Sequence, residues 1–513
     1  RLDRLGPARE LAQIGAVLGR DFAYQLLRGV AELDEPALQS SLERLSEADL
    51  LFVEGAPPQA TYRFKHALIQ DAAYDSLLKS RRQALHRRAA EILRDEPQRA
   101  AAEPEVIAHH FTQAGLDDLA IEWWGKAGDQ ALRRSAFQEA IAHLGKAIAM
   151  ADKAAGGTTA GASGERRQLQ VAYGNALIAA RGYGAPETTE AFARARESAA
   201  GDKDAPERLA ADYGLWVGSY VRGELSSMRT HATAFLNEAR PDSPEAGIAH
   251  RVAGVTHWVA GEYHTALDHL ERALALFVPG RDDDLAFRFG QDAGVSARLN
   301  LAFALWPLGD VARAVSLVEG AQERLADVAH AGTLGFGGQQ SALFELMRHD
   351  RRRLAQNALS LVRLTREHDL AMFKAFAVFL GGLVKEEGAS AGGLEDMRRG
   401  VELLRELDVV FFDGLLKIAL AEAEARAGNS DRAIAILDEA LATSDRTRYR
   451  AFEAELHRVR GEILIERDSA NYAPAEQAFL AAIAVAKQQG TRSFELRAAL
   501  SLAKLYQSTT RPA

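Results

Sequence analysis

The sequence predicts a mainly α protein, in which a small N-terminal domain precedes an α-α superhelix of repeated helical hairpins. Three observations lead to this prediction. Residues that open turns recur along most of the chain, small and large apolar residues stand at fixed distances from them, and the N-terminal segment follows another pattern. A chain of 513 residues also exceeds a single compact core, so it should divide into domains or extend as an array.

Residues 1–95 combine short helices with a β-hairpin. Asp34 is a good N-cap, and the apolar runs Leu50–Val53 and Thr61–Phe64 flank a turn that contains Gly and Pro. The predicted helices span Pro7–Val17, Phe22–Val30 and Glu35–Ala48. Three helices followed by a hairpin are typical of a winged helix, so we predict a winged-helix-like domain here.

Charge argues against a nucleic-acid partner. The helix before the hairpin has one basic residue, Arg44, and four acidic residues close by: Glu35, Glu43, Glu47 and Asp49. The whole chain has a formal net charge of −9, which opposes a phosphate backbone. A later helix carries a basic stretch that we interpret as a solvated face rather than a phosphate site: Lys79, Arg81, Arg82, Arg87, Arg88 and Arg94. Direct binding of nucleic acid is therefore not expected.

Beyond residue 95 a packing pattern repeats around a series of turns. The residues that open these turns are Gly115, Ser135, Gly261, Gly309, Gly388 and Gly428. Five positions after each stands a small residue, at Ala120, Ala140, Ala266, Ala314, Gly393 and Ala433. Nine positions after stands a larger apolar residue, at Trp124, Leu144, Leu270, Val318, Met397 and Leu437. Seven positions before stands another small residue, at Ala108, Gly128, Gly254, Ala302, Gly381 and Ala421. Small residues let two helix backbones approach closely, and the large residue fills the groove between them.

This pattern resembles that of tetratricopeptide repeats, although its average step of roughly forty residues exceeds their usual period of about 34. We expect the first helical hairpins over residues 96–153 and a tetratricopeptide-like superhelix over residues 166–513. Residues 154–165 between them are rich in Gly and lack apolar periodicity. They are predicted to be a flexible linker or, alternatively, an ordinary long loop between repeats.

Two regions resemble one family of signalling proteins. The segments Tyr62–Tyr74 and Leu85–Leu93 resemble the region just after the nucleotide-binding module of STAND-class ATPases. The nearest resemblance is to bacterial proteins in which a class III adenylate/guanylate cyclase domain precedes such a module and tetratricopeptide-like repeats. The final repeats resemble theirs at Glu455–Glu462, Ala475–Leu480 and Phe494–Ala498. The resemblance implies that residues 1–95 are the tail of the ATPase module and that the repeats are its sensor.

The same resemblance implies a role for His66. In STAND ATPases a histidine after the wing contacts the phosphates of the bound nucleotide, and His66 follows the second predicted strand at the start of a helix. A histidine beside a helix N-terminus can donate to phosphate. The alternative is a histidine that only caps local structure. ATP or ADP and Mg are expected only with the domains of the parent protein that this chain lacks, so no cofactor is expected in the chain itself.

No catalytic or metal-binding constellation is predicted. The chain has no cysteine and no H-E-x-x-H motif, and the sequences Gly125–Ala127 and Gly145–Ala147 lack the hydroxyl residue of a phosphate loop. The run Gly335–Gly338 is not followed by a nucleotide-fold unit, so we predict a flexible turn there. The chain is therefore not expected to be an enzyme.

Aromatic residues suggest a binding surface. Tyr220, Trp258 and Trp306 each stand three positions before a turn, near the end of the first helix of successive units, and Trp216 lies one helical turn before Tyr220. That helix lines the concave surface of tetratricopeptide arrays, so the four rings are predicted to bind a protein, a peptide or a small effector. The alternative is that the rings pack between neighbouring units.

The leading functional hypothesis is a non-catalytic sensor segment of a multidomain signalling ATPase, an adenylate/guanylate cyclase. The repeats would bind a partner and control the ATPase and cyclase domains of the same protein. The alternatives are the corresponding region of a bacterial transcriptional activator and a free-standing repeat scaffold. A cytoplasmic location is expected, because the absence of cysteine suits a reducing compartment. No membrane association is expected, because the longest apolar stretch, roughly 375–384, is about half of a membrane span. The chain begins with Arg1, and we expect a segment of a longer protein.

Overall fold

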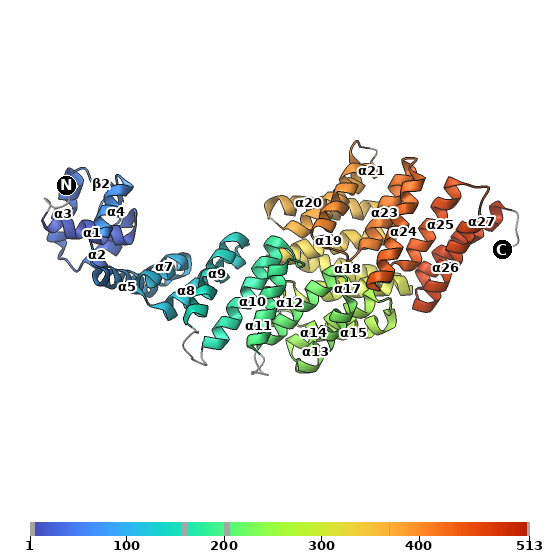
Figure 1. The fold of residues 1–513 in the computed structure, drawn as a ribbon, viewed down its shortest axis with the longest axis horizontal. Helices are drawn as coiled ribbons and strands as arrows, with labels where there is room; N and C mark the ends of the chain where they lie inside the picture. Colours follow the sequence, from blue (N-terminus) through green and yellow to red (C-terminus); the bar gives the residue numbers. More distant parts are fainter. Residues whose placement is uncertain (1–5, 155–161, 200–205, 369, 389, 510–513) are drawn as a thin grey trace. The chain divides into compact units, whose positions relative to one another are not determined.

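The computed structural model describes residues 6–154, 162–199, 206–368, 370–388 and 390–509. These residues form 27 helices and three strands. Figure 1 draws them as a ribbon coloured along the sequence. The chain divides into two compact units, Arg1–Leu169 and Gln170–Ala513. Of the predicted linker 154–165, residues 155–161 lie outside the described residues, whereas Ala154 ends helix α9 and Ala162 begins helix α10.

Unit 1 begins with three helices and a small sheet. The elements are α1 (Pro7–Leu18), β1 (Asp21–Ala23), α2 (Tyr24–Ala31), α3 (Glu35–Glu47), β2 (Leu51–Glu54) and β3 (Thr61–Phe64). The strands are antiparallel in the order β1-β3-β2, with Phe22 and Val53 both opposite Tyr62. The three helices and the hairpin confirm the predicted elements, and Asp34 caps α3 by accepting a 2.9 Å hydrogen bond from Ala37 N. Strand β1 was not predicted, because its three residues are too few for an alternating pattern.

The helices that follow are α4 (Ala67–Asp75), α5 (Lys79–Asp95), α6 (Pro97–Ala102), α7 (Pro104–Ala114), α8 (Asp117–Arg133) and α9 (Phe137–Ala154). The basic stretch lies on α5, and five of its six cations lie within ion-pair distance of a carboxylate: Arg81 of Glu10, Arg82 of Asp75, Arg87 of Glu91, Arg88 of Glu32 and Arg94 of Asp95. Local pairing of this kind agrees with the interpretation of this stretch as a solvated face.

Two histidines meet in the core of unit 1. The Nδ1 atoms of His86 on α5 and His110 on α7 lie 2.8 Å apart, and the Tyr74 hydroxyl lies 3.0 Å from His86 Nε2. Burial lowers the pKa of His86 to about 4 and that of His110 to about 3. Both rings are therefore neutral near pH 7, when one Nδ1 can donate to the other.

Unit 2 is built from helical hairpins. Its helices are α10 (Ala162–Arg181, which begins in unit 1), α11 (Pro186–Ser198), α12 (Pro206–Arg222), α13 (Leu225–Glu238), α14 (Pro244–Val259), α15 (Tyr263–Leu276), α16 (Leu285–Phe289), α17 (Ala293–Leu308), α18 (Val311–Leu325), α19 (Ala331–Arg348), α20 (Arg351–Glu367), α21 (Ala371–Glu387), α22 (Gly393–Glu406), α23 (Asp413–Arg426), α24 (Ser430–Thr447), α25 (Glu453–Arg467), α26 (Ala473–Gln489) and α27 (Arg492–Ser508). Except for the short α16, they follow one another as the predicted repeats require.

Close helix approaches confirm the predicted packing pattern in two hairpins, whereas in α21–α22 Gly382, and not the predicted Gly381, approaches Met397. A Cβ atom placed on Gly128 of α8 would lie 2.4 Å from the Leu144 side chain of α9. The equivalent pair in unit 2, Gly254 of α14 and Leu270 of α15, would approach to 2.6 Å. In both hairpins the small residue before the turn therefore makes room for the large residue after it.

The run Gly335–Gly338 lies inside helix α19, so the prediction of a flexible turn was wrong. A Cβ atom would lie 2.5 Å from the Phe373 ring at Gly335 and 2.4 Å from the Leu325 side chain at Gly337. These glycines therefore allow neighbouring side chains to pack directly against the backbone of α19.

The last repeats of unit 2 return to the first. Val410 N, before α23, donates to Val221 O over 2.8 Å, and Arg450 N, before α25, donates to Val259 O over 2.6 Å. Ser493 Oγ, on α27, donates to Trp306 O over 2.7 Å. Helices α23–α27, orange and red in Figure 1, thus lie beside the ends of α12, α14 and α17. The returning repeats cover part of the inner side of the superhelix.

Candidate functional site

His66, for which the family resemblance implies a phosphate contact, lies between β3 and α4. It is the N-cap residue of α4, follows β3 directly, and has an exposed side chain. A histidine so placed is accessible to a phosphate group beside the helix N-terminus. Its contact with nucleotide in a parent protein stays a prediction.

The four aromatic residues of the predicted stripe are not on an open surface. Trp258 is 5 % exposed and its ring centroid lies 5.4 Å from that of Phe412, while the Trp306 ring lies 5.8 Å from that of Phe494. The returning repeats carry both phenylalanines. These contacts match the alternative in which the rings pack between units, and the prediction missed them because it treated the concave side as uncovered.

Trp216 and Tyr220 have a different environment. Their rings stack with centroids 5.4 Å apart, and both border a cavity among helices α12, α14, α17, α19 and α21. The space that the centre of a water molecule can reach in this cavity measures about 30 Å³. Its aromatic wall consists of Tyr183, Tyr213, Trp216, Tyr220, Phe336 and Phe411. A binding role for Trp216 and Tyr220 therefore stays a prediction, and this cavity is the place where a ligand would contact them.

A buried arginine reaches this cavity from α14. Arg251 is 3 % exposed; its Nη1 donates to Gln291 Oε1 over 3.4 Å, and its guanidinium carbon lies 5.3 Å from the Tyr213 ring centroid. Its Nε and Nη2 atoms are buried and have no hydrogen-bond partner among the residues that the structure describes. A buried cation without full pairing costs free energy, which makes this arrangement unusual.

Two glutamines of α19 line the same cavity. Gln339 is fully buried, and neither its Oε1 nor its Nε2 finds a hydrogen-bond partner within the described part of the chain. Gln340 is 3 % exposed, and its Oε1 is likewise without a partner there. Buried amides are normally satisfied, so these atoms together with Arg251 form a set of donors and acceptors that a ligand can satisfy.

The cavity is electropositive. Among its described lining residues there is no Asp or Glu, and Arg251 is the only basic one. Burial raises the pKa of Tyr183 and of Tyr220 well above the usual range, so both phenols are neutral at physiological pH. The wall therefore carries one positive charge and several unused polar atoms.

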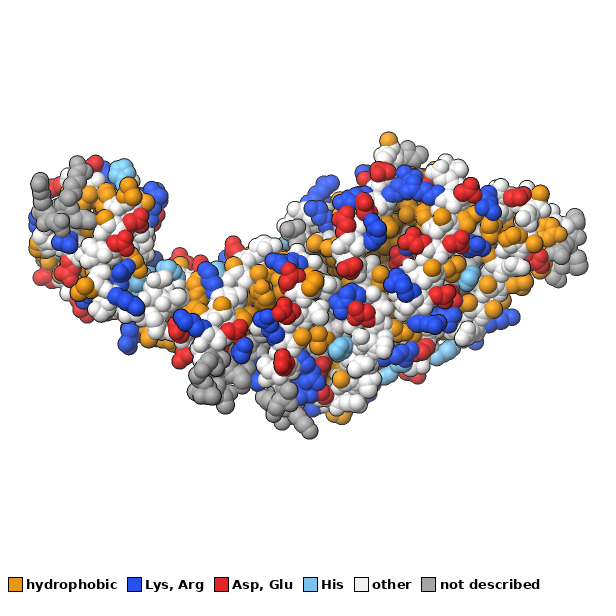
Figure 2. Space-filling view, in the orientation of Figure 1, with side chains coloured by type: hydrophobic (Ala, Val, Ile, Leu, Met, Phe, Trp, Pro, Cys, Tyr) orange, Lys and Arg blue, Asp and Glu red, His pale blue; other side chains and the backbone are white. Residues whose placement is uncertain are grey.

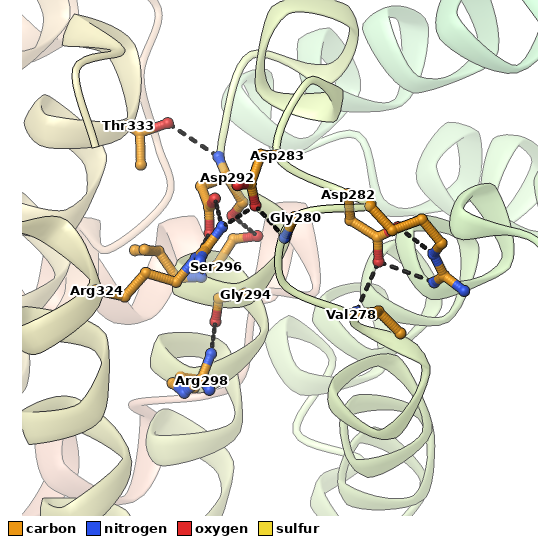
Figure 3. A network of polar contacts seen from close by, with 12 residues as sticks. Val278, Gly280, Asp282, Asp283, Asp292, Gly294, Ser296, Arg298, Arg324 and Thr333 are labelled. Atoms are coloured by element: carbon orange, nitrogen blue, oxygen red, sulfur yellow. Dashed lines mark hydrogen bonds and ion pairs between the residues drawn. The ribbon is translucent and has the colours of Figure 1, made fainter. Parts of the chain in front are cut away.

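A half-buried arginine in unit 2 is arranged in the opposite way (Figure 3). Arg324 donates from Nε to Asp292 Oδ1 over 2.8 Å, and from Nη2 both to Asp292 Oδ2 and to Asp283 Oδ1 over 2.6 Å. Asp292 Oδ1 also accepts from Val295 N over 2.8 Å and so caps α17. Hydrogen bonding to Asp292 raises the pKa of Arg324 further. This network fastens the loop before α17 to α18.

A wider groove of about 980 Å³ lies among α22, α23 and α24. Several of its charges pair with each other, including Arg222 with Glu224, Arg399 with Glu402 and Lys417 with Asp413. Figure 2 shows basic and acidic side chains interspersed over this unit. The groove therefore lacks the single charge sign that would select a ligand.

Within the described ranges, no group of three or more His, Asp and Glu residues could hold a metal ion. No helix in the described part of the chain is long and apolar enough to cross a lipid bilayer.

Sequence reasoning missed Arg251, Gln339 and Gln340. Arg251 stands far from the two glutamines in the sequence, and only the curvature of the superhelix brings α14 and α19 together. One signal was available, because two adjacent glutamines interrupt a long apolar segment at 331–347. That signal predicts buried polar atoms once the segment is known to be helical.

A family model described as tetratricopeptide repeat matches residues 247–272, 295–319 and 415–439. These ranges correspond to the hairpins α14–α15, α17–α18 and α23–α24. The match agrees with the packing pattern of unit 2, which therefore contains tetratricopeptide repeats.

An uncharacterised protein of Rhizobium meliloti (strain 1021) is 25 % identical over 511 residues, covering 98 % of this chain and 49 % of the relative. The chain spans about half the length of this curated relative.

Three solved structures that align with much of this chain are the following. A STAND protein with a tetratricopeptide repeat sensor from Pyrococcus horikoshii aligns over 98 % of this chain and 63 % of its own, at 10 % identity and a TM-score of 0.32. The Cut9–Hcn1 hetero-tetramer of the APC/C aligns over 94 % and 91 %, at 12 % identity and a TM-score of 0.44. A Rap protein complexed with competence and sporulation factor aligns over 77 % and 98 %, at 9 % identity and a TM-score of 0.32.

Proposed function

We propose that this chain is a non-catalytic sensor segment of a larger signalling protein, in which the tetratricopeptide repeats bind an effector or a partner. The observation that carries the proposal is the cavity at Arg251, whose buried polar atoms lack partners among the described residues. A purely structural scaffold would gain stability by pairing these atoms or replacing them with apolar groups. Their presence beside aromatic rings is what a binding site requires.

The proposed parent is a multidomain STAND ATPase, specifically an adenylate/guanylate cyclase. The resemblance of Tyr62–Tyr74 and of the last repeats to such proteins supports this assignment, and the double length of the Rhizobium meliloti relative leaves room for further domains. In this proposal residues 1–95 are the winged-helix-like tail of the ATPase module. The element order of three helices and a β1-β3-β2 sheet is compatible with that role.

The proposed mechanism is a change in population between two states. Binding to the repeats would favour one arrangement of the N-terminal module and thereby control the ATPase and cyclase domains. ATP or ADP and Mg would belong to those domains, with His66 contacting the phosphates. The proposed location is the cytoplasm, and neither nucleic acid nor membrane is a proposed direct partner.

The proposal can be tested on the purified chain in two steps. The chain is first incubated with ATP or GTP and Mg, and we expect neither hydrolysis nor cyclic nucleotide. Hydrogen exchange of unit 2 is then measured with a panel of amino acids, short peptides, sugars and organic acids. We expect at least one compound to protect helices α12, α14 and α19 saturably. Turnover of nucleotide by the chain, or the absence of protection by every compound, would contradict a sensor role.

A further inference from the structure

We infer that the effector of the Arg251 cavity is a small monocarboxylate, whose head group binds side-on to the guanidinium of Arg251. This inference rests on the proposed sensor function and specifies the chemistry of the ligand. It follows from the geometry of the unused donors, from the charge of the cavity wall and from its size.

The donors left over on Arg251 define the shape of the acceptor. Nη1 is engaged with Gln291, whereas Nε and Nη2 have no partner within the described residues. These two nitrogens form one edge of the planar guanidinium and point in the same direction. Two parallel N–H groups match the two oxygens of a carboxylate, which is the strong bidentate form of this interaction.

The glutamines complete the recognition of a carboxylate ligand. Gln339 offers an amide NH₂ as a donor, and its Oε1 and that of Gln340 can accept from a hydroxyl or amine on the body of the ligand. All of these atoms are buried, so each hydrogen bond forms away from competing water. A ligand that lacked the matching polar atoms would leave them unsatisfied, which gives the site its selectivity.

The charge and the size of the cavity narrow the class of ligand further. A single buried cation balances one negative charge, so a phosphate dianion would bring an uncompensated charge into the wall. One water molecule needs about 10–15 Å³ of the space that its centre can reach, so the 30 Å³ of this cavity holds roughly two. This size suits a carboxylate head with a short body. The neighbouring apolar side chains, such as Val255, Phe336 and Met372, would contact that body.

Such a ligand would connect two repeats. Arg251 belongs to α14 and Gln339 to α19, and the cavity is also bordered by Phe411, whose ring lies 4.9 Å from that of Tyr220. Phe411 belongs to the segment before α23 in which Val410 binds the backbone of α12. A carboxylate at Arg251 would therefore favour one arrangement of the first repeats relative to the returning ones.

Calorimetric titration of the full chain tests the inference. The probes are acetate, butyrate, glycolate and lactate, which have short bodies with and without a hydroxyl group, each compared with its neutral amide in a low-chloride buffer. The variants are Arg251→Met, Arg251→Lys and Gln339→Leu, and Arg405→Met is the control that removes an exposed positive charge from the same unit. Lysine keeps the charge of Arg251 but lacks the two-nitrogen edge.

We expect at least one carboxylate to bind saturably and its amide to bind at least tenfold more weakly. Arg251→Met should weaken the carboxylate at least tenfold, Arg251→Lys and Gln339→Leu should weaken it less, and Arg405→Met should leave it unchanged. Equal binding of acid and amide, or unchanged binding by Arg251→Met, would overturn the inference. If Arg251→Met did not fold, the other two variants would decide. Weaker carboxylate binding by Gln339→Leu and Arg251→Lys would support the inference, and unchanged binding by both would overturn it.

The result also separates this inference from the proposed function. If a sugar or a peptide protected unit 2 while all four carboxylates failed to bind, the carboxylate assignment would fall and the sensor role would stand. If no compound of any class bound, both would fall.

Discussion

Two arginines of unit 2, the buried Arg251 and the half-buried Arg324, have opposite environments. Arg324 meets both oxygens of Asp292 and one of Asp283, whereas Arg251 meets only Gln291 and the Tyr213 ring. Gln291 and Asp292 are consecutive residues, so one loop supplies a neutral partner to one arginine and a carboxylate to the other. The comparison shows that burial of a charge does not by itself indicate its role.

The pairing of the charge is the informative property. A fully paired arginine inside a repeat protein positions its own loop and helix cap, as Arg324 does for the start of α17 (Figure 3). Arg251 has one guanidinium edge, Nε and Nη2, without a hydrogen-bond partner among the described residues. That edge is available to an acceptor from outside the chain. This difference predicts different consequences when each arginine is removed.

The largest effect is expected for Arg324→Met. The change leaves Asp292, which is 2 % exposed, without its cation, and breaking a buried pair in this way costs about 3–5 kcal/mol. Calorimetric unfolding should show a lower transition temperature for unit 2. The double variant Arg324→Met, Asp292→Asn should recover part of the loss, because it removes the uncompensated charge. An unchanged transition in the single variant would show that the network in Figure 3 carries no stability.

An intermediate effect, a loss of about 3 kcal/mol by pH 5.5, is expected from acid at the histidine pair of unit 1. His86 and His110 have folded-state pKa values of about 4 and about 3, well below the unfolded value near 6.5. Their contribution to stability is therefore complete above pH 6.5 and is lost as the pH falls toward 4, because the unfolded state binds protons that the folded state does not. The slope is about 1.4 kcal/mol per pH unit for each histidine that stays neutral.

Hydrogen exchange of peptides from α5 and α7 measures this acid effect directly. Protection of both helices should decline between pH 6.5 and 4.5 more steeply than that of α14 and α17. In the variant His86→Leu, His110→Leu the extra decline should disappear. If protection of α5 and α7 declined equally with and without the histidines, the decline would belong to other titratable groups, such as carboxylates.

The smallest effect on stability, and the most discriminating one, is expected for Arg251→Met. Because the wild-type side chain buries a charge with incomplete pairing, its removal should leave the ligand-free chain unchanged or more stable by up to about 2 kcal/mol. The measurement is the same calorimetric transition as for Arg324→Met. A destabilisation as large as that of Arg324→Met would make Arg251 a structural residue.

The repeat architecture could be predicted from the sequence because it depends on local spacing. Gly128 with Leu144 and Gly254 with Leu270 were identified by position alone and meet as expected. The short strand β1 and the helical run Gly335–Gly338 could not be recognised in this way. In both cases contacts with distant residues decide the conformation, such as pairing with β3 or packing against Phe373.

The candidate site could be predicted only in part. Tyr220, Trp258 and Trp306 share one register position, but aromatic residues of the returning repeats contact all three rings. Whether a superhelix closes on itself depends on small rotations that accumulate over many hairpins, and no local motif encodes them. The meeting of Arg251 with Gln339 depends on the same rotations, so a single sequence does not reveal it.

Anomalous diffraction from crystals grown in sodium bromide tests the central claim most directly, since bromide is a monovalent anion small enough for the cavity at Arg251. The account predicts a bromide peak within hydrogen-bond distance of Arg251 Nε and Nη2 that butyrate displaces and that Arg251→Met abolishes. Bromide peaks only at exposed arginines, with none at Arg251, would contradict it.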